Sequence, residues 1–349
     1  MAVRSKWQSL PTEAINPSSL GIDKLSPEDI VDLMVNEDRK MLEAVKRERE
    51  RIAVGIDMIA TALRKGGRIV FVGAGTSGRL GILESSEMPP TFSTDPELIQ
   101  AVMAGGRDAI FSAKEGVEDN YEEGARSITR FQPTRKDIVV GVSASGMTQF
   151  VRGALTRARQ AGARIIFITC DPATELQTFV DLTIAPGVGA EVIAGSTRLK
   201  AATATKLVLN MLTTGAMVRI GKTYGNLMVD VHTGSEKLKD RARRIVNIVT
   251  GIDYDEADQM LKKAHWNVKA AIVMQKTGLI YPKALARLRK MNDSMREAIG
   301  EDIEPRLRGM LQGHAEAAFL GSPGSPEASG SKSSKPRARK TPAPGQPTW

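Results

Sequence analysis

The sequence predicts an α/β fold, a doubly wound parallel sheet with helices on both faces. Short apolar, β-branched runs recur along the chain, most are followed by a glycine- or serine-rich loop, and helical patterns separate them. The runs lie at Ile69–Val72, Ile99–Met103, Asp137–Val142, Arg164–Thr169 and Leu182–Ile184. These features together favour one sheet with helices before and after it.

The rest of the chain is divided around this sheet. Ser26 and Pro27 open a helical pattern as N-cap and first helical residue, and this pattern spans two helices before the first strand. We expect five parts, namely an N-terminal polar segment with helices (1–65), the α/β domain (66–234), a small helical domain (235–300), a terminal helix (301–318) and a basic tail (319–349). The tail is rich in Ser, Pro, Gly, Lys and Arg, so we expect it to be disordered.

Composition narrows the class of function. The net charge is +9, but residues 321–349 carry five basic residues against one acid, and aromatic residues make up only 4% of the chain. We therefore expect no nucleic-acid partner. We expect no membrane span or signal peptide, because no apolar run is long enough. Cys170 is the only cysteine, which excludes an internal disulfide and favours a cytoplasmic protein.

The first strand leads into a glycine-rich loop, GAGTSG, at residues 73–78. A helical pattern follows from Leu80 to Glu87, and we expect Pro89 and Pro90 to end it. A strand, a glycine turn and a helix start together present free N–H groups to an anion. The candidate binding residues in this loop are Gly75, Thr76 and Ser77.

The glycine spacing also fits a dinucleotide site, which requires an acid at the end of the next strand, about 20 residues on. Asp95 and Glu97 are near that spacing, but they fall in a loop just after Pro90. We therefore favour a phosphate over a nicotinamide cofactor.

A second polar loop follows the strand at Asp137–Val142. Ser143, Ser145 and Thr148 surround Gly146 there, at the start of the next helix. Either loop taken alone is better interpreted as an ordinary helix N-cap with additional serines. Two such loops at the carboxyl ends of neighbouring strands, where open α/β sheets bind ligands, favour a phosphate site.

These motifs carry a family resemblance. GAGTS followed by S-x-S-G-x-T resembles the sugar isomerase (SIS) domain, which binds phosphosugars. The longer strings GAGTSGRLGILESSEMPPTF, KEGVEDN, GAEVIAGSTRLK, LVLNML and GNLMVDV, with TEAINPSS near the N-terminus, resemble the N-acetylmuramic acid 6-phosphate etherases. The resemblance covers roughly residues 12–300. It implies a SIS-type sheet domain and a small ubiquitin-associated-like helical domain near residues 250–280, which we interpret as packing or interface material.

The resemblance also implies a reaction: cleavage of the lactyl ether of N-acetylmuramic acid 6-phosphate to N-acetylglucosamine 6-phosphate and D-lactate. The ether at C3 lies β to the aldehyde of the open-chain sugar, so removal of the C2 proton permits elimination, and water then adds at C3. Two carboxyl groups suffice for these proton transfers. No cofactor is expected, and the three histidines form no metal-ligand pattern.

Two glutamates match the catalytic residues of the family. Glu87 in ESSEMPP matches the acid that protonates the departing lactate, and Glu118 in EGVED matches the second glutamate, most simply the base at C2. Without the resemblance, Glu118 reads as one of five acids on a solvated helix. Glu84, one turn before Glu87, could raise the pKa of Glu87 through like charge. Arg198 and Lys200 fit an anion-binding or a structural role equally well.

The sequence departs from the family at several positions. The family commonly has Asp where this chain has Glu84 and Thr-Pro-Tyr at residues 148–150, and it usually has Gly and Gln at the positions of Ala202 and Thr205. The change to Gln149 and Phe150 removes a hydroxyl near the phosphate loop. The basic tail is not part of the family pattern.

Two other functions use the same domain. A non-catalytic phosphosugar sensor resembling the glucokinase regulatory protein would need the sugar loops but neither glutamate, whereas an aldose–ketose isomerase would need a base near C2. Because the chain contains one SIS domain, the resemblance further implies a homodimer with shared active sites.

Overall fold

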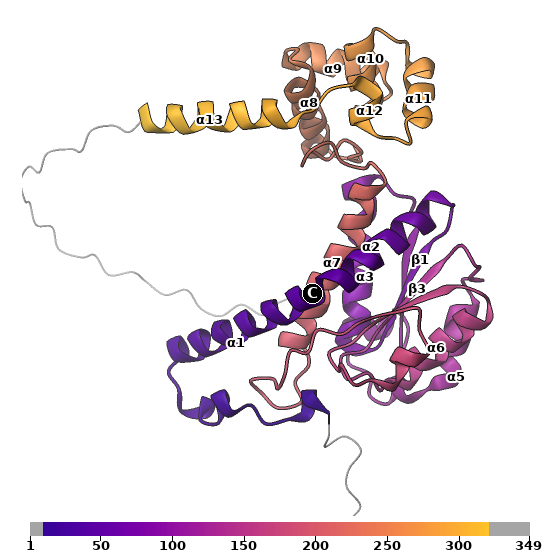
Figure 1. Cartoon of the computed structure of the whole chain (residues 1–349), viewed down its shortest axis with the longest axis vertical. Helices are drawn as coiled ribbons and strands as arrows, with labels where there is room; N and C mark the ends of the chain where they lie inside the picture. Colours follow the sequence, from indigo (N-terminus) through magenta and orange to yellow (C-terminus); the bar gives the residue numbers. More distant parts are fainter. Residues whose placement is uncertain (1–9, 321–349) are drawn as a thin grey trace, which may run out of the picture. The chain divides into compact units, whose positions relative to one another are not determined.

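The chain folds around a five-stranded parallel sheet in the order β2-β1-β3-β4-β5 (Figure 1). This computed structural model describes residues 10–320, with side chains as far as residue 312. The predicted tail beyond residue 320 and the first nine residues lie outside the described part. The strands are β1 Ile69–Gly73, β2 Ile99–Met103, β3 Ile138–Val142, β4 Arg164–Ile168 and β5 Leu182–Ile184. Each lies within one residue of a predicted run, which confirms the predicted α/β sheet.

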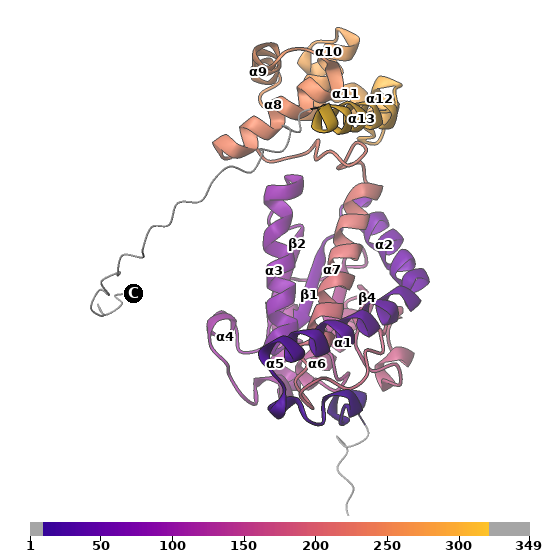
Figure 2. The ribbon, with the colours of Figure 1, turned by 90° about the vertical axis from the view of Figure 1, so that its left-hand side faces the viewer.

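Helices cover both faces of the sheet. Successive side chains of a strand point to opposite faces, and all residues of β1 are buried, so both faces need a covering layer. Ile69 and Phe71 of β1 pack in one apolar core with α2 (Arg49–Arg64), α3 (Gly75–Phe92) and α7 (Lys200–Arg219). Val70 and Val72 pack in a second core with α5 (Tyr121–Thr129) and α6 (Gln149–Gln160). Figures 1 and 2 show the two layers, with α2, α3 and α7 together on one side of the strands.

Three short 3-10 turns, Pro11–Glu13, Pro17–Ser19 and Ile22–Lys24, precede α1 (Pro27–Arg47). Ser26 accepts a hydrogen bond from the Asp29 N–H and Pro27 is the first helical residue, as predicted. The helical pattern divides at Glu48, where α1 ends and α2 begins.

The prediction that Pro89 and Pro90 end the first helix of the sheet domain is wrong. Helix α3 runs through both prolines to Phe92 and ends at Ser93, which has a left-handed backbone with φ +48°. Neither proline can donate a backbone hydrogen bond. Met88 and Phe92 are buried in the core on the same helix, and we attribute the continuation of α3 to that packing.

The acidic segment at residues 109–125 is not the single helix that its spacing suggests. It contains α4 (Asp108–Phe111), a loop, a 3-10 turn at Val117–Asp119 and then α5. Gly116 has φ +78°, a conformation outside the helical region, and Asn120 caps α5 by accepting from the Glu123 N–H. Glu118 therefore lies in a short turn before α5.

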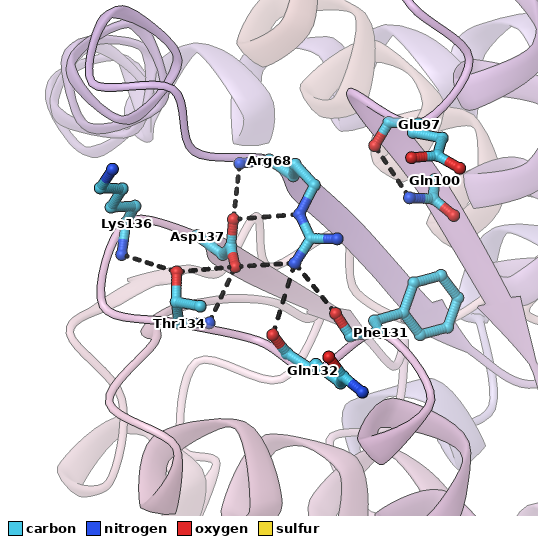
Figure 3. A network of polar contacts seen from close by, with 8 residues as sticks. All are labelled: Arg68, Glu97, Gln100, Phe131, Gln132, Thr134, Lys136 and Asp137. Atoms are coloured by element: carbon cyan, nitrogen blue, oxygen red, sulfur yellow. Dashed lines mark hydrogen bonds and ion pairs between the residues drawn. The ribbon is translucent and has the colours of Figure 1, made fainter.

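The amino ends of β1 and β3 are held together by a buried carboxylate (Figure 3). Asp137 accepts hydrogen bonds from the backbone N–H and guanidinium of Arg68, at 2.8 and 3.1 Å, and from the Thr134 N–H at 2.8 Å. Burial would raise the pKa of Asp137, but these bonds outweigh it and lower the pKa. β3 begins at Ile138, one residue later than predicted.

A loop of residues 220–235 follows α7, and the helices of the described chain resume at Glu236. They are α8 (Glu236–Thr250), α9 (Tyr254–Lys263), α10 (Val268–Thr277), α11 (Tyr281–Lys290) and α12 (Met295–Ile299). α13 (Glu304–Leu320) belongs to a separate unit that begins at residue 304. Within the described residues, no helix combines the length and apolar character that a membrane crossing requires.

Candidate active site

A cavity of about 390 Å³ opens at the carboxyl ends of β1, β2 and β3. It is the place where an open parallel sheet binds its ligands. Five of the six predicted binding residues line it, namely Gly75, Thr76, Ser77, Ser145 and Thr148, and so does Glu118. The chain thus brings the two predicted loops and one predicted glutamate together.

The start of α3 forms one wall of the cavity. Gly75, Thr76 and Ser77 are in the first turn of this 18-residue helix, and no side chain caps it. Gly75 has φ +53°, which a glycine adopts without strain. The unpaired N–H groups of this turn, with the positive end of the helix dipole, are suited to a phosphate.

The loop after β3 forms a second wall. Ser143 is buried and its hydroxyl bonds to the hydroxyl of Thr148 at 2.8 Å, so Ser143 supports Thr148 from behind and does not itself line the cavity. Gly146 has φ +73°, and a Cβ there would come within 2.9 Å of the Thr174 hydroxyl. Glycine is therefore required at this turn.

Glu118 reaches the cavity on a loop that α3 holds in place. The guanidinium of Arg79 donates to the carbonyl oxygens of Ala109 at 2.8 Å and Ile110 at 2.9 Å, at the base of this loop. Lys114, further along the loop, bonds to Asp108 at 3.2 Å. Arg79 and Lys114 both line the cavity, so its wall carries two cationic side chains beside Glu118.

Glu87 does not line this cavity. It is an exposed residue on α3, 11 positions after Thr76, which corresponds to about 16 Å along the helix axis. Glu84 is buried, and its carboxylate accepts hydrogen bonds from Asn210 at 2.7 Å and from Thr213, both on α7. Glu84 therefore joins α3 to α7.

Lys200 has a structural role. Its ammonium is buried and lies 2.7 Å from the Glu37 carboxylate of α1. Glu191 accepts from the backbone N–H groups of Lys200 and Ala201, so it caps the start of α7 at residue 200. Arg198 is exposed and does not line the cavity.

The departures from the family pattern affect the cavity unequally. Ala202 and Thr205 both line it, and the Thr205 hydroxyl donates to the Ala201 carbonyl at 2.8 Å. Phe150 is 1% exposed and packs in the α5–α6 core, so its missing hydroxyl does not face the cavity.

Five further residues that the sequence did not single out as binding residues also line the cavity, namely Glu13, Arg79, Lys114, Gly195 and Thr197. Glu13 is part of the string TEAINPSS and Thr197 is part of GAEVIAGSTRLK, two of the strings that resemble the etherase family. Neither string indicates that residues this far from the glycine loops reach the same cavity.

A parallel sheet with hydroxyl-rich loops at its carboxyl edge is typical of a SIS-type phosphosugar-binding domain. Residues 51–159 match the family described as the glucokinase regulatory protein N-terminal SIS domain. The chain is also 46% identical over 297 residues to an N-acetylmuramic acid 6-phosphate etherase of Microcystis aeruginosa, covering 84% of this chain and 97% of the relative. With the etherase of Salinibacter ruber it shares 47% identity over 296 residues, covering 84% and 95%. The chain belongs to the N-acetylmuramic acid 6-phosphate etherase family.

Proposed function

We propose that this chain is a carbon–oxygen lyase that cleaves the D-lactyl ether of N-acetylmuramic acid 6-phosphate, giving N-acetylglucosamine 6-phosphate and D-lactate. The observation that carries the proposal is the meeting of Thr76, Ser77, Ser145, Thr148 and Glu118 in one cavity of a chain that belongs to this family. Such an activity serves cell-wall sugar recycling, and we propose that it takes place in the cytoplasm.

The phosphate would bind at the start of α3. The backbone N–H groups of its first turn and the hydroxyls of Thr76 and Ser77 are donors from one wall, and Ser145 and Thr148 add hydroxyls from the other. The hydrogen bond between the hydroxyls of Ser143 and Thr148 holds Thr148 in position. This arrangement binds a phosphate through neutral donors and a helix end.

Glu118 would act as the base at C2. Its carboxylate takes the C2 proton of the open-chain sugar, and the electron pair of that C–H bond forms the C2–C3 double bond as the C3–O bond breaks. An acid donates a proton to the departing ether oxygen, which leaves as D-lactate. Water then adds at C3 and a proton returns to C2, which restores a saturated sugar.

Glu87 would be the acid, contributed by a second copy of the chain. It lies outside the cavity of its own protomer, so the site would be completed in a homodimer. Leu83, one turn earlier on α3, is 43% exposed, and Met211 on the neighbouring α7 is 41% exposed. Exposed apolar residues on the two packed helices α3 and α7 support a contact between two copies of this chain.

Lactate release in water enriched in oxygen-18 tests the reaction. The wild type should release lactate and carry the label at C3 of the product sugar, because the C3–O bond breaks and water adds there. Tight phosphosugar binding without lactate would instead favour the sensor, and conversion to a ketose would favour the isomerase.

Mixed dimers test the shared site. Glu87→Gln and Glu118→Gln chains should each be inactive alone. Co-expressed, they should recover about a quarter of wild-type activity per chain, because half of randomly paired dimers contain one site with both glutamates. If both glutamates act within one chain, no activity returns.

A further inference from the structure

The N-terminal segment before α1 brings an additional carboxylate to the cavity. Glu13 is in the 3-10 turn Pro11–Glu13 and lines the cavity wall with Gly195. The Gly195 N–H donates to the Thr12 carbonyl at 3.1 Å. A Cβ on Gly195 would come within 3.0 Å of the Glu13 carboxylate, so this contact is close.

A buried polar network fixes the two segments that meet at Glu13. The Asn16 side-chain amide donates to Glu37 at 2.9 Å and to the Ala190 carbonyl at 3.1 Å, and Lys200 donates to the same carboxylate at 2.7 Å. Asn16, Glu37 and Lys200 are each at most 6% exposed. Burial of polar groups is costly unless they are paired. The network therefore anchors residues 12–19 and 190–200 against each other.

The carboxylate that this anchor positions is itself open to the cavity. Glu13 is exposed, and no hydrogen bond between residues 10 and 312 is made to its side-chain oxygens. An ionised carboxylate accepts hydrogen bonds and donates none. It repels a phosphate and a lactyl carboxylate, and it favours neutral donors such as sugar hydroxyls and an amide N–H.

We infer that Glu13 is a specificity-determining residue that accepts a hydrogen bond from a neutral hydroxyl or amide donor of the sugar. This inference rests on the proposed function, since that function defines the ligand. Glu13 would orient the part of the sugar away from the phosphate, while Glu118 performs the proton transfer. A hydrogen bond to a charged group of this kind accounts for about a 10- to 100-fold change in affinity.

Binding of the product N-acetylglucosamine 6-phosphate, measured by calorimetry, tests this without requiring turnover. Glu13→Ala should weaken binding and raise KM by about 10- to 100-fold with kcat changed less, and Glu13→Gln, which keeps one acceptor, should weaken it less. Asp23→Ala is the matched control, because Asp23 is an exposed acid of the same segment outside the cavity. It should bind as the wild type does.

Binding of 2-deoxyglucose 6-phosphate identifies the donor group. This ligand has no acetamido group at C2. If that group is the donor, Glu13→Ala and the wild type should bind the ligand equally well. If the donor is a hydroxyl elsewhere on the sugar, Glu13→Ala should bind it about 10- to 100-fold more weakly than the wild type does.

Unchanged binding and KM in both Glu13 variants, with a native circular dichroism spectrum, would overturn the inference. A fall in kcat of the Glu13 variants at constant KM, with an altered pH profile, would also overturn it, because that result indicates that Glu13 takes part in proton transfer. A wild type that binds the product but releases no lactate contradicts the proposed function, and the affinities of the Glu13 variants for the product then decide the inference separately.

Discussion

The ammonium of Lys200 lies 2.7 Å from the carboxylate of Glu37, and each side chain is only 4% exposed. The pair joins the start of α7 to α1 across 163 positions of sequence. The same Glu37 carboxylate accepts a hydrogen bond from Asn16, which anchors the segment that carries Glu13. The ion pair therefore stabilises the wall of the cavity that Glu13 forms.

Removing one member of this pair should destabilise the protein strongly. Lys200→Met leaves the Glu37 carboxylate buried without its main partner, which costs about 3–5 kcal/mol of unfolding free energy. The double variant Glu37→Leu, Lys200→Met should recover much of this loss, because neither charge of the pair is then left buried without its partner. Urea unfolding of both variants measures the difference, and equal losses in the two would contradict the ion-pair explanation.

The same carboxylate should make stability depend on pH in the acid range. Burial raises the pKa of Glu37, but hydrogen bonds from Lys200, Lys40 and Asn16 outweigh it and lower the pKa from 4.5 to about 2. The folded state therefore binds fewer protons, so this contribution is present above about pH 4.5 and is lost as the pH falls toward 2. The stability difference between wild type and Glu37→Gln should narrow over that range. A constant difference from pH 7 to 3 would exclude this assignment.

Arg79 should act as a positioning residue for Glu118. Its guanidinium holds the carbonyl oxygens of Ala109 and Ile110, so Arg79→Met should free the loop that carries Glu118. We expect kcat to fall by about 10- to 100-fold, because a displacement of about 1 Å can cost this much. Steady-state kinetics with partial rescue by added guanidinium checks the prediction. Arg126→Met is the control, since Arg126 pairs with Glu123 on the exposed face of α5.

Gly78 should not tolerate a side chain. A Cβ at this position would lie 2.6 Å from the side chain of Met103 and 2.9 Å from the carbonyl oxygen of Gly73. Gly78→Ala should therefore destabilise the fold by about 1–3 kcal/mol. At Gly21, by contrast, a Cβ meets nothing within 4 Å, and Gly21→Ala should change stability by less than about 0.5 kcal/mol. Similar denaturation midpoints for the two variants would contradict the close approach of α3 to β1.

Cys170 should be unreactive in the native protein. It is 1% exposed, and burial raises the pKa of its thiol to about 12, so almost no thiolate is present at neutral pH. A thiol reagent should detect no free cysteine in the folded chain and one per chain in denaturant. Rapid modification of the folded protein would show that the core around α7 opens.

The strands were predictable because their signal is local. An apolar run such as Ile69–Val72 between polar loops identifies a strand buried on both faces without knowledge of its neighbours. The glycine and serine loops were predictable for the same reason. The acidic segment around Glu118 was not, since the left-handed Gly116 and the Asn120 cap replace the helix that its spacing suggests.

Local sequence patterns are enough to predict the α/β class, the five strands and the two polar loops, and the long ordered motifs are enough to predict the family. Tertiary structure alone decided that α3 continues through Pro89 and Pro90, that Lys200 pairs with Glu37, and that Glu13 reaches the cavity while Glu87 of the same chain does not. The physical reason is the range of the interactions. Strand and loop signals arise within a few residues, whereas core packing, buried ion pairs and cavity walls join segments more than 100 residues apart.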